Sequence, residues 1–376
     1  MKIGVVTTQY ASNYGALLQT YAMQRYLNNI SSVDSEVLAY YPEHYKEYWK
    51  LMPQINGIKD AVILFLCLMT PWRVIGIKNR YKKMNEFIKR YIPCSKPYYS
   101  KEEIEAETCP YDVLICGSDQ IWNVARHRKL QEVWFLGLSG NGWENAKRIA
   151  YAPSVADPIP KERKIEIKDK LGCFSSVSVR EVSDVEEIGR LYPGKVYHVC
   201  DPVFLLSAQQ WMEIEEKPRM DEPYILCYFL NPSKEAADIV RKVKKMTNLK
   251  VVQIDINRYN KIPTDLDILS ASPTEFIGWI NHAEYVITNS FHCTAFSVLF
   301  QKNLLVVKKK TANSRMESLL GLIGQSSKMV SLEDLNGFTY DDLKTDYQSG
   351  QDIFASFVLQ SKKYLLNALG VCHDCD

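Results

Sequence analysis

The stretch that decides the fold is Tyr285-Val286-Ile287-Thr288-Asn289-Ser290-Phe291-His292-Cys293-Thr294. Its first four residues form a strand-like apolar run, and a helical pattern follows over residues 295–300. This order places His292 at a strand-to-helix turn. In open α/β sheets such turns lie at the carboxyl ends of strands, where ligands bind, and a helix N-terminus there attracts anions. A histidine at this turn can also act as an acid or a base near neutral pH.

Strands alternate with helices on both sides of this stretch. The strands are continuous apolar runs, a pattern typical of parallel sheets that are covered on both faces. The predicted strands are 3–7, 36–40, 113–116, 148–152, 176–180, 224–229, 250–254, 285–288 and 304–307, and the predicted helices are 16–27, 81–91, 234–246, 274–280 and 294–300.

The length of 376 residues favours two domains over a single core. The strand and helix pattern restarts after Asp201-Pro202, and residues 218–223, charged and bounded by prolines, form the expected linker. We therefore predict an α/β fold of two Rossmann-like domains with parallel sheets, covering residues 1–218 and 219–376, with the active cleft between them. The first domain carries a helical insertion at about 58–91, and the second ends in a helix at about 350–369.

Composition excludes several classes of protein. The net charge of +2 makes no general case for nucleic-acid binding. Ten cysteines are scattered without regular spacing, many in apolar surroundings, which indicates a reducing, cytosolic compartment. We expect no secretory signal, because the chain begins with a strand. The longest apolar run, 61–69, is about half of the roughly 20 residues that a membrane span needs.

The segment Asn13-Tyr14-Gly15-Ala16 marks the end of the first strand and the start of a helix. One interpretation is a backbone nest that contacts a sugar or a phosphate, since a glycine at this turn permits close approach of a ligand. The other is that Asn13 caps the helix. We favour the first.

Four polar side chains crowd the turn Gly117-Ser118-Asp119-Gln120-Ile121-Trp122-Asn123, which follows another buried strand. Asp119 is either a carboxylate of the site or a capping residue, and serine and asparagine are also common in turns. The turn has neither the GxGxxG pattern of dinucleotide sites nor the GxxxxGK pattern of phosphate-binding loops.

Candidate cations follow two other strands. Arg180 ends the strand 176–180, and Lys308-Lys309-Lys310 with Arg315 follow the strand 304–307. Arginine matches a carboxylate or a phosphate at two points, which favours Arg180 and Arg315. The simpler alternatives are solvated lysines and a surface pair between Arg180 and Glu181.

Two further segments have open interpretations. Residues 58–90 join an apolar stretch to dense basic charge, which suits either an anionic membrane surface or a core helix followed by a solvated basic helix. Cys372 and Cys375 form a CxxC without a second pair, so a frayed terminus is a better interpretation than a metal site.

Six segments in this order resemble the polysaccharide pyruvyl transferase family. They are Asn13–Gln19, Ile115–Asn123, Tyr151-Ala152-Pro153-Ser154, Ser178-Val179-Arg180-Glu181, Asp201–Leu206 with Trp211, and Thr288–His292. The resemblance runs from residue 3 to about 325. In the family pattern a glycine usually follows the histidine, whereas Cys293 stands there in this chain.

The resemblance implies a fold like that of the GT-B glycosyltransferases and a transferase that moves pyruvate from phosphoenolpyruvate onto sugar hydroxyls as a ketal. It also implies a saccharide acceptor that is linked to a lipid and is a precursor of a bacterial surface or capsular polysaccharide. This chemistry requires no metal and no cofactor beyond the donor itself. The enzyme would work in the cytoplasm, with peripheral contact to the inner face of the membrane.

The candidate residues divide between these substrates. His292, Asp119 and Arg180 are the predicted catalytic residues. Arg180, Arg315, Lys308, Ser290 and His292 are assigned to the donor, and Asn13, Tyr14, Ser118 and Asn123 to the acceptor. We expect Arg180→Ala and His292→Ala to abolish turnover without unfolding the protein.

Two other functions share the same features. A GT-B glycosyltransferase that uses a nucleotide sugar would have the same two domains. A saccharide-binding protein without catalysis would bind the acceptor but release no phosphate from phosphoenolpyruvate. Thermal stabilisation by nucleotides or by phosphoenolpyruvate distinguishes these functions.

Overall fold

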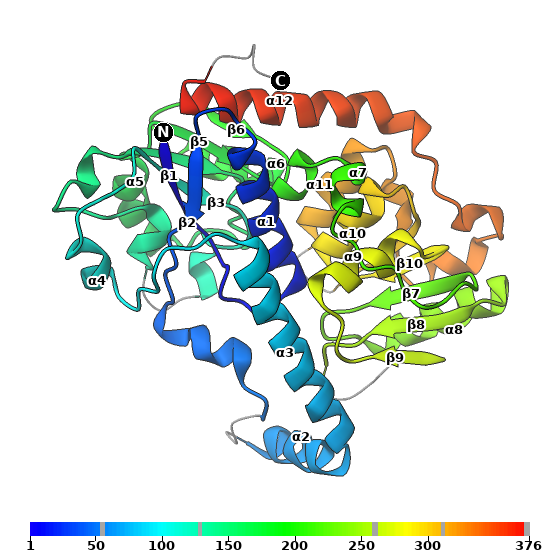
Figure 1. Ribbon diagram of the computed structural model, residues 1–376. Coiled ribbons are helices and arrows are strands. Elements are labelled where there is room, and N and C mark those ends of the chain that lie inside the picture. Colours follow the sequence, from blue (N-terminus) through cyan, green and yellow to red (C-terminus); the bar gives the residue numbers. More distant parts are fainter. Residues whose placement is uncertain (53–56, 127–129, 258–261, 310–312, 372–376) are drawn as a thin grey trace. The chain divides into compact units, whose positions relative to one another are not determined.

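The computed structural model describes residues 1–52, 57–126, 130–257, 262–309 and 313–371. The chain divides into two compact units, and each is built on a six-stranded sheet in which every strand pair is parallel (Figure 1). The predicted α/β fold with two Rossmann-like sheets is confirmed.

Unit 1 consists of residues 1–48, 88–206 and 352–376. Its sheet has the strand order β2-β1-β3-β4-β5-β6. The strands are β1 Lys2–Val6, β2 Asp34–Val37, β3 Val113–Gly117, β4 Lys147–Tyr151, β5 Ser176–Val179 and β6 Val196–His198, and the helices are α1 Tyr14–Asn28, α4 Lys101–Glu105, α5 Lys164–Leu171, α6 Val182–Gly189 and α12 Gln351–Leu369, whose first residue is assigned to unit 2.

Unit 2 consists of residues 49–87 and 207–351. Its sheet has the order β12-β11-β10-β7-β8-β9. The strands are β7 Tyr224–Tyr228, β8 Lys250–Ile254, β9 Leu266–Ile268, β10 Tyr285–Thr288, β11 Asn303–Val307 and β12 Met329–Val330, and the helices are α2 Ile58–Met69, α3 Pro71–Tyr91 with its last turn in unit 1, α7 Ala208–Met212, α8 Lys234–Thr247, α9 Pro273–Asn281, α10 Phe291–Leu299 and α11 Ser314–Leu322.

The central strands are apolar because both of their faces are covered. Every residue of β3, β7 and β10 is buried. In each sheet the chain first adds strands on one side and then crosses to the other. The strand order therefore reverses between β1 and β3 in unit 1 and between β7 and β10 in unit 2. In parallel α/β sheets, ligands bind at the carboxyl ends of the strands that flank such a reversal.

The two units are not the two contiguous segments expected from the sequence, because α12 packs in unit 1. Ser361 Oγ accepts a hydrogen bond from the Cys200 backbone N–H at 2.9 Å, and the Tyr364 hydroxyl donates to the Ala150 carbonyl at 3.0 Å. The ring of Phe357 lies 4.7 Å from that of His198. A boundary at residue 218 separates this helix from the sheet that it covers.

Residues 49–87 leave unit 1 in the same way and pack in unit 2. Arg73 of α3 is buried and forms ion pairs with Asp255 and Asp267, the second at 3.0 Å. Lys83 pairs with Glu275 at 2.7 Å. Gly76 of the same helix lies so close to Leu269 that an added Cβ would stand 2.4 Å from the leucine Cβ. Buried ion pairs and close packing therefore hold this insertion against the second sheet.

Candidate active site

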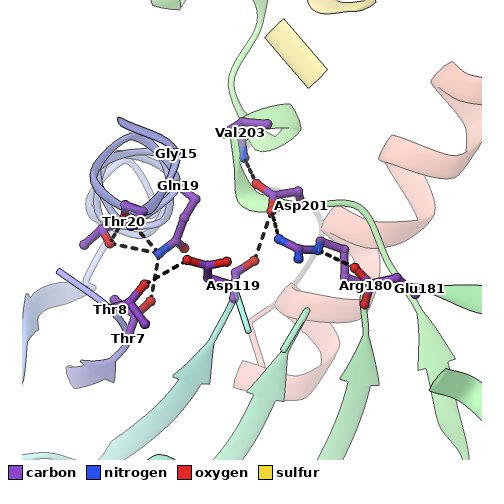
Figure 2. A network of polar contacts seen from close by, with 12 residues as sticks. Thr7, Thr8, Gly15, Gln19, Thr20, Asp119, Arg180, Glu181, Asp201 and Val203 are labelled. Atoms are coloured by element: carbon purple, nitrogen blue, oxygen red, sulfur yellow. Dashed lines mark hydrogen bonds and ion pairs between the residues drawn. The ribbon is translucent and has the colours of Figure 1, made fainter. Parts of the chain in front are cut away.

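The switch point of unit 1 carries polar side chains from two strand ends. Thr7 and Thr8 follow β1, and Ser118 and Asp119 follow β3. The Thr8 hydroxyl donates to Asp119 Oδ2 at 3.2 Å, so one hydrogen bond joins the two strand ends (Figure 2). Gln19 of α1 donates to Thr7 Oγ1 at 2.8 Å. The carboxylate predicted at residue 119 therefore lies at the place where ligands bind in this fold.

Asp119 has a left-handed backbone conformation with φ of +64°. Aspartate and asparagine adopt this conformation more readily than most residues other than glycine. The Asp119 carbonyl accepts a hydrogen bond from the Ser154 N–H at 2.9 Å, which ties the turn after β3 to the turn after β4. This turn keeps the half-buried carboxylate at the sheet edge rather than continuing the chain into a helix.

Arg180 follows β5 and lies between two carboxylates (Figure 2). Its Nε donates to Glu181 Oε1 at 2.8 Å and its Nη1 donates to Asp201 Oδ2 at 2.7 Å. Ser118 Oγ donates to the same Asp201 oxygen at 3.1 Å. The Arg180 side chain is only 2% exposed. Burial alone would lower the pKa of Arg180, but the neighbouring carboxylates outweigh it, so the pKa is raised and the charge is kept.

Among the residues that the structure describes, carboxylates cluster around Arg180 at this edge. Arg180 faces the carboxylates of Glu181 and Asp201 directly, and Asp119 acts on it from nearby. Asp184 adds no full negative charge at neutral pH, because burial, and then the neighbouring Glu181, raise the pKa of Asp184 to about 8. Within the described ranges, Arg180 therefore has two carboxylates in direct contact and a third, Asp119, nearby. An edge with an excess of carboxylates accepts hydrogen bonds from hydroxyl groups better than it binds a phosphate.

The other acceptor candidates differ in their surroundings. Asn13 caps α1, since its Oδ1 accepts hydrogen bonds from the N–H groups of Gly15 at 2.9 Å and Ala16 at 3.3 Å. Tyr14, the first residue of that helix, is fully buried. Asn123 is buried, and its Nδ2 donates to Asp157 Oδ2 at 2.9 Å. The Asn123 Oδ1 has no hydrogen-bond partner among the described residues, so this atom is a candidate contact for a ligand.

The switch point of unit 2 holds His292. Helix α10 begins at Phe291, three residues earlier than predicted, so His292 lies in its first turn. Ser290 is the N-cap residue, but its side chain makes no capping hydrogen bond. Asn289 joins the two central strands of the sheet: its Oδ1 accepts from the Leu230 N–H at 2.8 Å and its Nδ2 donates to the Leu230 carbonyl at 3.0 Å. His292 is buried at this strand end.

The predicted cations of unit 2 lie after β11. Lys308 forms an exposed ion pair with Asp334 at 2.8 Å, so its charge already has a partner. Arg315 lies in the first turn of α11 and is partly buried. Lys310 lies outside the described residues, as do Cys372 and Cys375. Trp211, a member of the family pattern, packs on Phe296 of α10 with the ring centroids 4.8 Å apart.

Thr8 was not singled out from the sequence, and Ser154, Glu181 and Asp201 were part of the family resemblance but were given no role at the site. Thr8, Glu181 and Asp201 belong to the hydrogen-bonded network, and Ser154 is buried with an Oγ that has no partner in the described part of the chain. Each of them lies just after a strand, so its position at a strand end was the available signal. That Asp201 contacts Arg180 across 21 residues could not be inferred from spacing. Within the described ranges, no three acidic, histidine or cysteine side chains are grouped closely enough to hold a metal ion.

Two parallel six-stranded sheets, each with a reversal of strand order, form an α/β fold similar to that of GT-B proteins. The structure of S. aureus MnaA with UDP is similar, with a TM-score of 0.52, 11% identity and coverage of 98% of this chain and 97% of that one. A UDP-N-acetylglucosamine 2-epimerase has a TM-score of 0.50, 9% identity and coverage of 100% and 97%. At these identities the similarity concerns the fold alone.

The family is shown by a second comparison. The family model for polysaccharide pyruvyl transferase matches residues 13–308. This range is well over half of the chain, so the chain belongs to the polysaccharide pyruvyl transferase family and is a transferase. The family implies a saccharide acceptor. A search of curated protein sequences found no match.

Proposed function

We propose that this protein transfers the pyruvyl group of phosphoenolpyruvate onto two hydroxyls of a saccharide as a ketal. The family match over residues 13–308 carries the proposal. The carboxylate-rich edge at Asp119 supports it, because the acceptor is a polyol whose hydroxyls need hydrogen-bond acceptors and a base.

Unit 1 serves the acceptor in this proposal. Asp119 accepts the proton of the attacking hydroxyl, while Ser118 and the Asn123 Oδ1 orient the sugar, and Asn13 and Tyr14 form the adjoining turn. Arg180 acts as a positioning residue, since two of its nitrogens are bonded to Glu181 and Asp201. This role differs from the direct contact with the donor that the sequence suggested.

Unit 2 serves the donor. Phosphoenolpyruvate carries a phosphate and a carboxylate, and the first turn of α10 offers N–H groups and a positive dipole end, with Ser290 and His292 beside them. Arg315 is the preferred cation, and Lys308 is the weaker candidate because it is paired with Asp334.

The reaction balances without a metal or a redox partner. The methylene carbon of the donor gains a proton, and the first sugar hydroxyl attacks the carbon that bears the phosphate. Phosphate then leaves with the C–O bonding electrons, and the second hydroxyl closes the ketal as its proton is lost. His292 is the proposed acid for the methylene carbon, and Asp119 is the proposed base for the hydroxyls.

The proposed acceptor is a lipid-linked saccharide, a precursor of a bacterial surface or capsular polysaccharide. The protein would then work in the cytoplasm at the inner face of the membrane. Among the helices that the structure describes, none is long and apolar enough to cross a bilayer.

Thermal unfolding with different ligands tests the proposal. The midpoint should rise with phosphoenolpyruvate and not with matched concentrations of phosphate, pyruvate, UDP or GDP. His292→Gln should lose this rise while unfolding at the same temperature without ligand. A rise with a nucleotide alone would instead favour a glycosyltransferase. Binding of a saccharide without phosphate release from phosphoenolpyruvate would favour a non-catalytic binding protein.

A further inference from the structure

Large apolar side chains are exposed along α2 and the start of α3. They are Val62, Phe65, Leu68, Met69, Trp72 and Ile75, and each is between 52% and 65% exposed. Val62, Phe65 and Leu68 of α2 stand three residues apart, as do Trp72 and Ile75 of α3, which is the spacing of neighbours along a helix surface, and Met69 follows Leu68 directly. Soluble surfaces carry scattered apolar residues, but six large ones exposed within 14 residues of the chain favour an interaction surface. We call these six residues the apolar series.

Exposed basic residues begin one turn beyond the apolar series. Lys78, Lys82, Lys89 and Arg90 of α3 are exposed, with Glu86 the one exposed acidic residue between Lys78 and Arg90. The other cations of this helix face inward: Arg73 and Arg80 are buried, and Lys83 is paired with Glu275. The exposed part of the helix therefore keeps a net charge of four minus one, or +3.

We propose that the apolar series and this basic part of α3 dock the protein on an anionic lipid surface. Helix α2 has 12 residues and is thus about 18 Å long, too short to span a hydrocarbon core of about 30 Å. It would lie in the interface with its apolar side chains below the headgroups, while the lysines contact the anionic headgroups above them.

A lipid surface fits better than a second copy of the chain. A symmetric dimer through this surface would bring the same +3 charge of each copy together, and like charges facing each other oppose association. An anionic membrane attracts this charge instead. This proposal rests on the proposed function, since a lipid-linked acceptor is reached only at a membrane.

Sedimentation with vesicles tests the docking surface without any substrate. The protein should bind vesicles rich in phosphatidylglycerol at low salt, and should bind pure phosphatidylcholine vesicles far less. Phe65→Glu with Leu68→Glu should weaken binding by about tenfold or more. The double variant Lys78→Glu/Lys82→Glu should weaken vesicle binding as well, by about fivefold or more per substituted lysine, and this effect should shrink at high salt.

Ile165→Glu provides the matched control. Ile165 of α5 is 76% exposed and lies between Lys164 and Lys168, but it belongs to no apolar series. This variant should bind vesicles as the unaltered protein does. Equal loss of binding in the control and in the Phe65/Leu68 variant would overturn the proposal, and so would vesicle binding that neither pair of substitutions changes.

Trp72 gives a readout that is specific to this surface. It is 60% exposed, whereas the six other tryptophans are buried or only partly exposed. Lipids brominated near the headgroup should quench tryptophan fluorescence, and Trp72→Phe should abolish most of this quenching. Quenching that persists in Trp72→Phe would show that another surface docks.

Two further results separate the alternatives. A Phe65/Leu68 variant that changes from dimer to monomer in light scattering, with no vesicle binding by the unaltered protein, would assign the surface to a second copy. Phosphate release from phosphoenolpyruvate with a detergent-dispersed acceptor would leave the proposed function standing even if the vesicles were not bound.

Discussion

At the scale of residues, Asp119 has a left-handed backbone conformation, and its carboxylate accepts a hydrogen bond from the Thr8 hydroxyl. Asparagine tolerates the same conformation and can still accept the Thr8 hydrogen bond, so Asp119→Asn should change the free energy of unfolding by less than about 0.5 kcal/mol. Because the amide is no base, turnover should fall by about 10²- to 10⁴-fold.

Phosphate release under saturating donor, together with urea unfolding, measures both effects of Asp119→Asn. Asp112→Asn is the control, because Asp112 precedes the same strand at its opposite end and accepts from the Lys2 N–H. Activity retained in Asp119→Asn would remove Asp119 from proton transfer.

The burial of Arg180 changes the expected effect of Arg180→Ala on stability. From the sequence, Arg180→Ala is expected to abolish turnover and leave the fold intact. The structure leads to another expectation, because the variant leaves Glu181 and Asp201 buried without their cation. Removing one partner of a buried ion pair costs about 3–5 kcal/mol. Urea unfolding followed by circular dichroism should show a loss of this size, and unchanged stability would contradict it.

Asp184 gives unit 1 a distinctive pH dependence. Its pKa in the folded protein is about 8, against an ordinary value of 3.8. Between these values the folded state holds one proton more than the unfolded state, so the contribution of Asp184 to the free energy of unfolding falls as the pH rises, by at most about 1.4 kcal/mol per pH unit. Above about pH 8 the contribution is constant.

Asp184→Asn removes this titration. The asparagine keeps an oxygen that can accept the hydrogen bond from the Val155 N–H, which Asp184 Oδ2 accepts at 2.9 Å in the unaltered protein. The variant should therefore gain stability relative to the unaltered protein as the pH rises from 5 to about 8. Thermal midpoints at several pH values check this, and a difference that is independent of pH would show that the Asp184 carboxyl is ionised in the folded protein.

At the scale of elements, α3 is fixed in unit 2 by a buried cation. Arg73→Met leaves Asp255 buried, and the pKa of Asp255 is already raised, chiefly by burial. We expect unit 2 to lose about 3–5 kcal/mol. Lys82→Met is the control, because its pair with Glu86 is exposed and is worth less than about 0.5 kcal/mol.

Hydrogen exchange locates the effect of Arg73→Met. Amides of β8 and β9 should exchange faster, while those of the unit 1 sheet should not. Faster exchange that is confined to unit 1 would contradict the assignment of residues 49–87 to unit 2.

At the scale of the whole molecule, α12 returns to a sheet whose last strand, β6, ends at His198. Ser361 accepts a hydrogen bond from the Cys200 N–H, and Tyr364 donates one to the Ala150 carbonyl. Ending the chain at residue 351 removes both partners and uncovers apolar side chains of unit 1. Amides of β4, β5 and β6 should then exchange faster, while those of β7 and β10 keep their protection. Equal protection of the amides of both sheets in the shortened chain would contradict this expectation.

The sequence predicted a large part of the fold. The apolar runs at residues 113–116 and 285–288 both became central parallel strands, because a strand that is buried on both faces is predominantly apolar. The start of α10 was placed three residues too late, since the polar first turn of a helix at a strand end resembles a loop.

The site was predicted only in part. Asp119 and His292 were located from strand ends, because the carboxyl edge of a parallel sheet is set by chain direction. A pair between Arg180 and Glu181 was one of the alternatives, but it was expected at the surface, whereas the structure buries it. The pair between Arg180 and Asp201 was not predicted, because it depends on how two turns meet. Only the structure could show this.

The sequence by itself determined the parallel sheets and the residues at their strand ends, since local periodicity and chain direction fix both. The tertiary structure alone decided that α12 belongs to unit 1, that residues 49–87 belong to unit 2, and that Arg180 forms ion pairs with buried carboxylates. These features depend on contacts between residues far apart in the chain, which no local pattern encodes.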